Sequence, residues 1–258
     1  MDTVDESIKK TKDSFEKRFT ERKFYDKQTH DDKHLNMMIK KLNITSGMKI
    51  LDLGTGNGYV AFAIARNNKQ CHIVGLDIVI DALKRNRLKA RQQGLYNLEF
   101  ISYDGKNFPF QNGEFDIIVS RYVLHHFPII ENCFAEISRV LKPSGKLLIS
   151  DPSPTKEDGS GFIDDYMKLF DDGHIKYYTK EEFVNLAEKF ELGFIDNIET
   201  VLNFPKERDK AIGFKELLNN YDQKVKNSYK VNVFENEIYM SQPVNNLLFE
   251  KAKPKTNF

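Results

Sequence analysis

The sequence has little cysteine, no clear charge excess and no long apolar run. Its two cysteines, Cys71 and Cys133, lie in apolar segments, without CxxC spacing and without a nearby histidine at ligand spacing. We therefore expect two reduced core thiols and no metal site. Lys+Arg number 39 and Asp+Glu 38, a net charge of +1, so the basic excess of a nucleic-acid-binding protein is missing and no nucleic-acid partner is expected.

Signals for export or membrane insertion are also missing. The segment from Met1 to Glu6 lacks the basic and apolar regions of a signal peptide. No apolar run approaches the roughly 20 residues that span a bilayer. We expect a cytoplasmic protein without membrane contact. Its 258 residues, 40% of them hydrophobic, are enough for one large domain with a sizeable core.

The middle of the chain alternates between strand-like and helix-like patterns. Short apolar runs occupy residues 49–53, 72–76, 98–103, 115–120 and 146–150, and helical patterns occupy 59–66, 79–93 and 130–141. Such alternation predicts an α/β fold with parallel strands, right-handed crossovers and helices on both faces of the sheet. In this architecture ligands bind beyond the carboxyl ends of the strands, where strand order reverses.

The two flanks of this region have different patterns. Ile8, Phe15 and Phe19 share one face of an expected first helix, and a second helix is expected near residues 31–42. These helices could form a lid over a site or a solvated layer on the core. The single domain is accordingly divided into a helical lid (1–45), a cofactor-binding half (46–155) and a substrate-side half with inserted helices (156–258).

The substrate-side half has a looser pattern. A short helix is expected at 162–170, and Thr179 with Glu182 forms a capping box that opens a helix through residue 190. Strands are expected at 194–201, 229–239 and 246–250, with a charged helical stretch at 206–225.

A glycine-rich turn joins the first expected strand to the next helix. It contains Asp52, Gly54, Thr55, Gly56, Asn57 and Gly58. Glycines permit unusual backbone angles and let a ligand approach the main chain. The helix that follows presents free N–H groups to an anionic group. This sequence therefore predicts a cofactor loop.

Two cofactor classes use such a loop. The dinucleotide pattern G-x-G-x-x-G fails from Gly54, and from Gly56 it fits only in its looser form, ending at Ala61 and leaving Asp52 without a role. The pattern acidic-x-G-x-G-x-G fits from Asp52 to Gly58 without adjustment. An NAD-dependent oxidoreductase stays an alternative, as does a cofactor-binding protein without catalysis.

The chain resembles the class I S-adenosylmethionine-dependent methyltransferases. Within this class it resembles the ubiquinone and menaquinone biosynthesis (type 11) group, and the resemblance is strongest over residues 48–151. The resemblance implies a doubly wound, mostly parallel, seven-stranded sheet with S-adenosylmethionine as cofactor. It also implies that the loop holds the methionyl part, that Asp77 binds the ribose hydroxyls and that Asp104 receives the adenine amino group. The implied cofactor set is completed by Tyr25, Ile78, Gly105, Ser120 and Arg121.

The acceptor is expected to be a small molecule. The Asn/Asp-Pro-Pro-aromatic motif of amino-group methylases of nucleic acids, a Pro-Cys nucleophile, and paired metal-binding carboxylates after the fourth and fifth strands are each missing from their usual positions. His125 follows the fourth strand, where the acceptor should lie, and is the first candidate for a general base. Its neighbour His126 should point elsewhere, and His174 is a further candidate. The sequence does not determine the oligomeric state.

Overall fold

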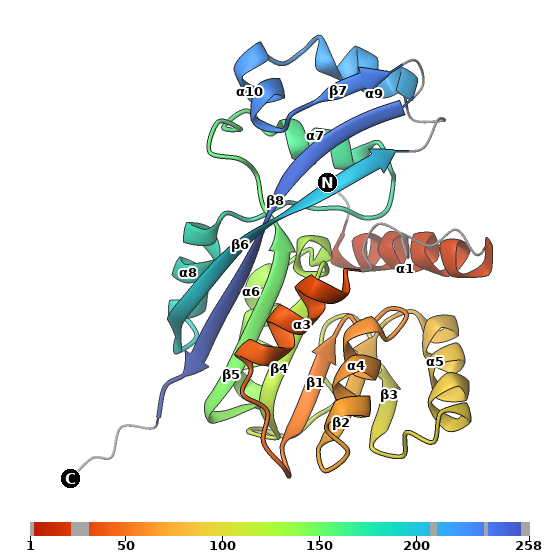
Figure 1. The fold of residues 1–258 in the computed structure, drawn as a ribbon, viewed down its shortest axis with the longest axis vertical. Coiled ribbons are helices and arrows are strands. Elements are labelled where there is room, and N and C mark those ends of the chain that lie inside the picture. Colours follow the sequence, from red (N-terminus) through yellow and green to blue (C-terminus); the bar gives the residue numbers. More distant parts are fainter. Residues whose placement is uncertain (1–2, 22–30, 207–210, 235–236, 254–258) are drawn as a thin grey trace.

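A mixed sheet runs through the whole molecule (Figure 1). The computed structural model describes residues 3–21, 31–206, 211–234 and 237–253. The sheet order is β3-β2-β1-β4-β5-β8-β6, with the short β7 paired to β8. Its parallel strands are β1 (Lys49–Leu53), β2 (His72–Asp77), β3 (Leu98–Ser102), β4 (Phe115–Arg121) and β5 (Leu141–Pro152). The order reverses between β1 and β4, so the carboxyl ends of these strands define the expected ligand site.

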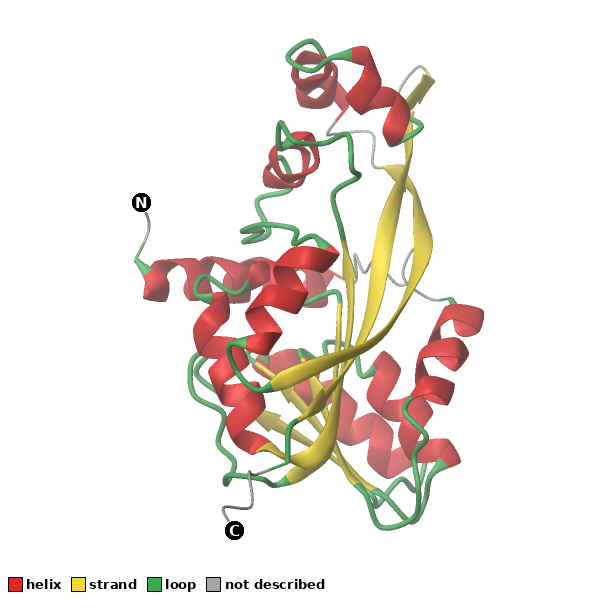
Figure 2. Ribbon diagram, turned by 90° about the vertical axis from the view of Figure 1, so that its left-hand side faces the viewer, coloured by secondary structure: helices red, strands yellow, loops and turns green. Residues whose placement is uncertain are grey.

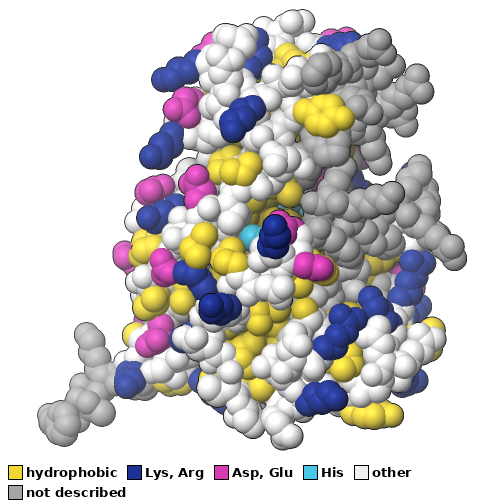
Figure 3. All heavy atoms as spheres, in the orientation of Figure 1, with side chains coloured by type: hydrophobic (Ala, Val, Ile, Leu, Met, Phe, Trp, Pro, Cys, Tyr) yellow, Lys and Arg dark blue, Asp and Glu magenta, His cyan; other side chains and the backbone are white. Residues whose placement is uncertain are grey.

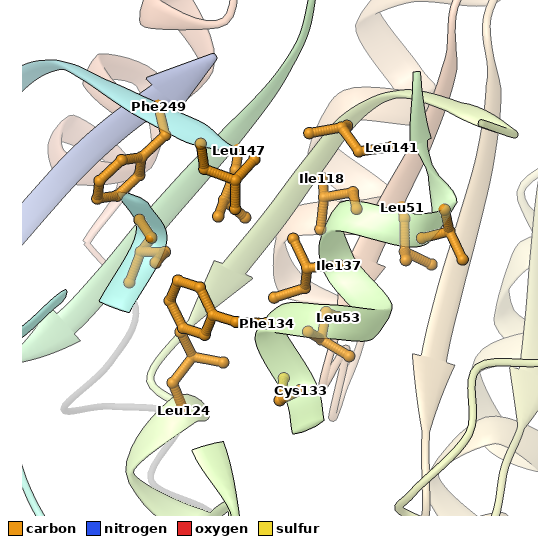
Figure 4. Packing of buried hydrophobic residues seen from close by; sticks show 14 of the residues in the cluster. Leu51, Leu53, Ile118, Leu124, Cys133, Phe134, Ile137, Leu141, Leu147 and Phe249 are labelled. Atoms are coloured by element: carbon orange, nitrogen blue, oxygen red, sulfur yellow. The ribbon is translucent and has the colours of Figure 1, made fainter. Parts of the chain in front are cut away.

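Helices cover both faces of the parallel strands. One face carries α3 (Asp32–Lys41), α4 (Tyr59–Asn67) and α5 (Ile80–Gln92). The opposite face carries α6 (Ile130–Val140) and α8 (Lys180–Glu188). Figure 4 shows Phe134 and Ile137 of α6 facing Leu53 of β1 and Ile118 of β4. Each of these side chains is at most 1% exposed, and so are Ile50 of β1 and Ile117 of β4 in the cluster on the opposite face. The strands are thus buried on both faces, as is usual for parallel sheets.

The carboxyl-terminal part extends beyond the parallel strands. β6 (Leu192–Lys206) and β8 (Glu237–Lys251) form a long antiparallel ribbon, which Figure 2 shows rising away from the other strands. This extension also holds α7 (Phe162–Lys168), α9 (Ala211–Leu218), α10 (Gln223–Ser228) and β7 (Asn232–Phe234). These elements share a separate apolar core, in which Phe162, Phe214 and Tyr229 are fully buried.

The amino-terminal helix α1 (Val4–Glu21) lies at the carboxyl ends of the parallel strands (Figure 1). On one side Nη1 of Arg85, in α5, donates to the carbonyl of Phe19 at 2.6 Å. On the other side Nζ of Lys10 pairs with Asp171 at 2.6 Å, in the loop after α7. The helix therefore bridges the parallel region and the extension. A 3-10 turn, η1 (Leu124–His126), follows β4 beneath it.

Basic side chains gather at the lower right of Figure 3, over α4 and α5. Several basic residues of α5 hold neighbouring elements. Besides the bond of Arg85 to α1, the Arg87 guanidinium donates to the carbonyl of Phe100 at 2.7 and 3.0 Å, and Nζ of Lys89 lies 4.6 Å from the Phe62 ring centroid. The local excess of positive charge is thus part of the packing of α5 against β3 and α4.

The α/β prediction is confirmed, with differences in the carboxyl-terminal part. The predicted strand at 229–239 is wrong in part, because Tyr229 ends α10 and the segment then divides between β7 and the start of β8. The helical stretch at 206–225 is likewise interrupted, and Asp222 caps α10 through Val225. β7 makes the sheet eight-stranded instead of seven-stranded. In the described ranges, no helix has the length and apolar character needed to cross a bilayer.

Candidate active site

A cavity of about 260 Å³ opens at the carboxyl ends of β1, β2 and β4. This is close to the lower end of the range usual for small-molecule sites. Its walls come from the glycine loop, the ends of β2 and β4, α1, α7 and β6. The lining includes Phe15, Phe19, Asp52, Gly54, Thr55, Gly56, Asn57, Tyr59, Asp77, Ile78, Val79, Tyr103, Arg121, Tyr122, His125, His126, Pro152, Met167, Asp172, Tyr177 and Leu202.

The glycine loop is fixed by main-chain hydrogen bonds to β2. The amides of Gly54 and Thr55 both donate to the carbonyl of Leu76, at 2.8 and 3.0 Å. Gly54 has φ +69°, and a Cβ there would come within 2.4 Å of Val123. Gly56 has φ +50°, but a Cβ there would meet no atom within 4 Å. Gly54 is therefore required by packing, whereas Gly56 keeps the main chain open toward the cavity.

Asp52 braces this loop from inside. Its Oδ2 accepts hydrogen bonds from the Thr55 hydroxyl at 2.7 Å and from the Ala61 amide at 3.1 Å. The side chain is 2% exposed, and burial raises the pKa of Asp52 to about 6 against these two bonds. Asp52 thus ties the loop to the start of α4, which explains the acidic position in the pattern.

Asp77 ends β2 on the opposite side of the loop. Its Oδ2 accepts from the Gly56 amide at 2.7 Å, and its Oδ1 accepts from the Val79 amide at 2.9 Å. Burial raises the pKa of Asp77, and the backbone bonds of Val79 and Gly56 oppose that rise. A buried carboxylate therefore borders the cavity beside the open main chain of the loop. A carboxylate in this position can accept two hydroxyl hydrogen bonds.

Most of the cofactor residues expected from the sequence meet at this cavity. Asp52, Gly54, Thr55, Gly56, Asn57, Asp77, Ile78 and Arg121 all line it. Gly58, Asp104, Gly105 and Ser120 lie outside its lining. The Asp104 carboxylate is instead bonded within its own turn, to the amides of Lys106 and Asn107 at 2.8 Å each. Tyr25 falls outside the described residues.

Arg121, Tyr59 and Tyr122 line the cavity next to the glycine loop. The sequence analysis did not predict that these three side chains lie together. The Arg121 guanidinium lies 5.1 Å from the Tyr59 ring centroid and 4.2 Å from that of Tyr122. Tyr122 has φ +60°, and its amide donates to the Ser150 carbonyl at 2.8 Å. This geometry places a cation between two aromatic rings at the cavity wall.

His125 forms a buried pair with Asp151. His125 Nδ1 and Asp151 Oδ1 are 2.6 Å apart, and Asp151 Oδ2 accepts from the amides of Val123 and Leu124 at 3.0 and 3.1 Å. Burial, reinforced by nearby His174, lowers the pKa of His125 to about 3. Burial raises the pKa of Asp151 to about 7 against its two backbone bonds. Among the described residues Nε2 of His125 has no hydrogen-bond partner, so it is available to a ligand.

The other two histidines of the region have different surroundings. His126 lies edge-on to Phe15 of α1, with ring centroids 5.2 Å apart, and burial lowers its pKa to about 3. His174 Nε2 is 2.8 Å from Asp164 Oδ1, and its side chain is fully buried. The cavity lining includes both His125 and His126, so the prediction that His126 points elsewhere is wrong. The lining omits His174, which packs against Tyr177.

The cover of the cavity contains residues that the sequence analysis missed. Arg18 of α1 lies 3.5 Å from Asp172, which is 3% exposed, and donates to the Phe170 carbonyl at 3.3 Å. Tyr177, Met167 and Leu202 complete this side. The spacing of Phe15 and Phe19 predicted an apolar face on α1. No sequence pattern joined residues of α1, the loop after α7 and β6 into one wall.

The fold and the loop define a doubly wound α/β protein with a nucleoside-type cofactor site. Residues 44–190 match the family model described as a methyltransferase domain, and the chain belongs to this methyltransferase family. The methyltransferase YcgJ of Bacillus subtilis, whose name calls it uncharacterized, is 28% identical over 163 residues, covering 63% of this chain and 64% of that protein. A glycine/sarcosine/dimethylglycine N-methyltransferase of Actinopolyspora halophila is 32% identical over 174 residues, covering 62% of this chain and 30% of that protein.

Solved structures support the same fold. The crystal structure of YcgJ superposes with a TM-score of 0.79 at 21% identity, covering 86% of this chain and all (100%) of that chain. A phosphoethanolamine N-methyltransferase of Haemonchus contortus, in complex with S-adenosyl-L-methionine, gives a TM-score of 0.60 at 19% identity, covering 86% of this chain and 53% of that chain. A further relative was found by sequence alone. The ubiquinone/menaquinone biosynthesis C-methyltransferase UbiE of Brucella canis is 27% identical over 167 residues, covering 64% of this chain and 59% of that protein.

Proposed function

We propose that this chain is an S-adenosylmethionine-dependent methyltransferase that acts on a small-molecule acceptor. The observation that carries the proposal is the position of Asp77. Its carboxylate borders the cavity and lies 2.7 Å from the amide of Gly56, in the loop that leaves β1. This brings the acidic end of β2 and the open main chain of the loop to one place, as binding of a ribose next to a methionyl group would require.

The cavity fits the cofactor chemically. The space beside Gly56 leaves main-chain groups of the loop accessible to the methionyl part. Asp77 would accept the ribose hydroxyls, and Arg121 would pair with the methionyl carboxylate. Ile78, Val79 and Phe19 form an apolar wall beyond Asp77, suited to a flat base. Bound there, S-adenosylmethionine supplies a methyl group on a sulfonium, which a nucleophile displaces in line.

The residues of the chain would position the acceptor and remove its proton. A neutral His125 that donates its Nδ1–H to Asp151 keeps the Nε2 lone pair for the acceptor. Asp151 is held in turn by two backbone amides, so it fixes the orientation of the imidazole. The α1 cover would limit access of water to the reacting atoms. The free, buried thiols of Cys71 and Cys133 are consistent with a cytoplasmic location, which we propose as well.

Calorimetry on the whole chain tests the cofactor. S-Adenosylhomocysteine should bind with a dissociation constant of roughly 1 µM, about −8 kcal/mol. Asp77→Ala should weaken binding by about 1–3 kcal/mol, because hydrogen bonds to a charged acceptor are lost. Asp52→Asn is the matched control, since Asp52 braces the loop from inside: it should lower the melting temperature with a smaller change in affinity. Binding of NAD⁺ in preference to S-adenosylhomocysteine would contradict the proposal.

A further inference from the structure

Among the described residues, Gln242 is the one side chain with two buried polar atoms that lack a hydrogen-bond partner. Gln242 lies in β8 and is 0% exposed. Neither its amide nitrogen Nε2 nor its amide oxygen Oε1 has a hydrogen-bond partner among the described residues. Leaving a buried donor or acceptor unsatisfied costs about 1–3 kcal/mol for each group. A side chain that carries two such groups is therefore a candidate for binding a ligand.

The register of the ribbon places this side chain on the cavity side of the sheet. Gln242 is paired with Leu202 of β6, and side chains of directly opposed residues lie on the same face. Leu202 lines the cavity. Val244, two residues further on and therefore on this face too, is paired with Pro152, which also lines the cavity.

The residue preceding Gln242 on this face gives the same placement. Met240 packs in one apolar cluster with Met167 of α7, and Met167 lines the cavity. Gln242 thus lies between two side chains, Met240 and Val244, that are each at most 2% exposed. Gln242 itself is outside the cavity lining, next to Leu202 across the ribbon. Leu202, Pro152 and Met167 are lining residues that do not belong to the glycine loop, and we assign this part of the cavity to the acceptor.

The chemistry of this end favours a neutral ligand. Leu202, Pro152 and Met167 carry no charge, and the nearby carboxylate of Asp172 is already paired with Arg18. A charged acceptor would lose its hydration here without gaining a counter-charge. An amide offers one acceptor and two donor hydrogens, so it can bind a carbonyl or a hydroxyl oxygen. The oxygen of such a ligand would accept a hydrogen bond from Nε2 of Gln242, and a ligand hydroxyl could instead donate its hydrogen to Oε1.

We propose that Gln242 is a specificity-determining residue that binds an oxygen-bearing group on a neutral, mostly apolar acceptor. The proposal rests on the proposed function, in which the cofactor occupies the glycine-loop side. His125 then faces the acceptor's reacting hydroxyl, and Gln242 binds a second oxygen at the far end of the same molecule. The acceptor class is thus a neutral hydroxyl compound with a carbonyl or second hydroxyl group remote from the methylated oxygen, and substituted phenols serve as its probes.

Two phenols of nearly the same shape test this assignment. 4-Hydroxyacetophenone carries a ketone where 4-ethylphenol carries a methylene group. Titrated into the protein saturated with S-adenosylhomocysteine, the ketone should bind about tenfold more tightly, the effect of one hydrogen bond to an otherwise unsatisfied group. Gln242→Met, similar in volume, should bind both phenols equally. It should also raise the melting temperature, because it removes two unpaired buried groups.

Ser241→Ala is the control, since Ser241 faces the other side of the ribbon and its hydroxyl donates to Asn203 Oδ1 at 2.7 Å. It should keep the tenfold preference. If Gln242→Met does not fold, Gln242→Leu is measured with the same pair. Equal affinities in the natural protein, a preference that survives in the variant, or no binding of either phenol would each overturn the assignment. Failure of the proposed function would appear earlier, as no binding of S-adenosylhomocysteine.

Discussion

The glycine loop and the cover over it are held by different kinds of interaction. In the loop the fixed contacts are short and mostly involve the main chain, such as the amides of Gly54 and Thr55 on the Leu76 carbonyl and that of Gly56 on Asp77. In the cover, α1 reaches the loop after α7 through long charged side chains. Lys10 pairs with Asp171, and Arg18 lies near Asp172.

This difference bears on how the site works. Main-chain hydrogen bonds within residues 52–79 connect neighbouring elements of the sheet, so the cofactor side is formed by the fold itself. An ion pair between exposed side chains, such as Lys10–Asp171, is screened by salt and contributes about 0–1 kcal/mol, whereas the Arg18–Asp172 pair is largely buried. We therefore expect the cofactor side to be present before a ligand arrives. The closure of the cover should depend on a few individual contacts.

The largest effect is expected where the two regions meet, at His125. His125→Asn should lower methyl turnover by about 100-fold or more while S-adenosylhomocysteine affinity stays the same, because general-base assistance is lost. In the natural protein turnover should rise with pH through about 7, because Asp151 then loses its proton and accepts the Nδ1–H of the neutral His125, which leaves the Nε2 lone pair for the acceptor. Turnover with a hydroxyl acceptor across pH 6–9 checks both. Unchanged turnover with the same pH profile would make His125 a packing residue.

The same pair makes a prediction for stability. A histidine whose pKa is lowered on folding contributes stability that is present above its unfolded pKa of about 6.5 and is lost as pH falls. A carboxyl group whose pKa is raised behaves oppositely, losing its contribution as pH rises toward its folded value of about 7. In the natural protein the two slopes should largely cancel between about pH 4 and 6.5.

Single substitutions should separate these slopes. Relative to the natural protein, His125→Asn should become less stable as pH rises through this window, and Asp151→Asn should become more stable. The limiting slope is about 1.4 kcal/mol per pH unit in each case. Urea unfolding at several pH values measures it. Parallel pH profiles for the two variants would show that His125 and Asp151 do not titrate as a pair.

A smaller effect is expected from the contacts of the cover. Arg18→Gln should weaken S-adenosylhomocysteine binding and raise the acceptor KM by about tenfold, because Asp172, 3% exposed, loses its cationic partner and, among the described residues, keeps only the His174 amide. Lys10→Gln is the matched control on the same helix. Its pair with Asp171 has side chains 49% and 77% exposed, so the effect should stay within about twofold and vanish in salt. Calorimetry at low and high NaCl distinguishes them. Equal effects of the two variants would contradict a closure that depends on Arg18.

The cofactor side was the more predictable region because its signals are local. β1 begins and ends at the predicted residues, and the capping box of Thr179 and Glu182 is present at the start of α8. Asp52 and Asp77 were located by their distance from the glycines along the chain. The sequence did not predict that Asp52 and Asp77 have different roles, because both are acidic residues beside the same loop. The bond from the Ala61 amide identifies Asp52 as the residue that stabilises the loop from inside. The bond from the Gly56 amide places Asp77 beside the open main chain of the loop, where we propose that it binds the cofactor.

The cover was less predictable because its contacts join distant segments. Arg18 meets Asp172 across more than 150 positions, as the bond to Phe170 at a separation of 152 residues illustrates. The predicted strand at 229–239 was wrong at its start for a similar reason. Tyr229 is apolar enough to continue a strand pattern, but its side chain is fully buried and its hydroxyl donates to Asp158 at 2.7 Å. Such tertiary contacts override a periodic pattern of a few residues.

The smallest effect is expected at Asp104, which the family resemblance assigns to the adenine amino group. The residue is exposed and its carboxylate is bonded to the amides of Lys106 and Asn107 and to the Asn107 side chain. These bonds lower the pKa of Asp104 and hold it in a turn, outside the residues that line the cavity.

Asp104→Asn keeps one oxygen for the turn, so S-adenosylhomocysteine affinity should change by no more than about twofold, within the scatter of an exposed substitution. Calorimetry beside Asp77→Ala measures the contrast. A loss of tenfold or more would mean that the turn rearranges on binding and that Asp104 receives the adenine amino group after all. The cofactor side would then be less completely formed in the free protein than its backbone bonds indicate.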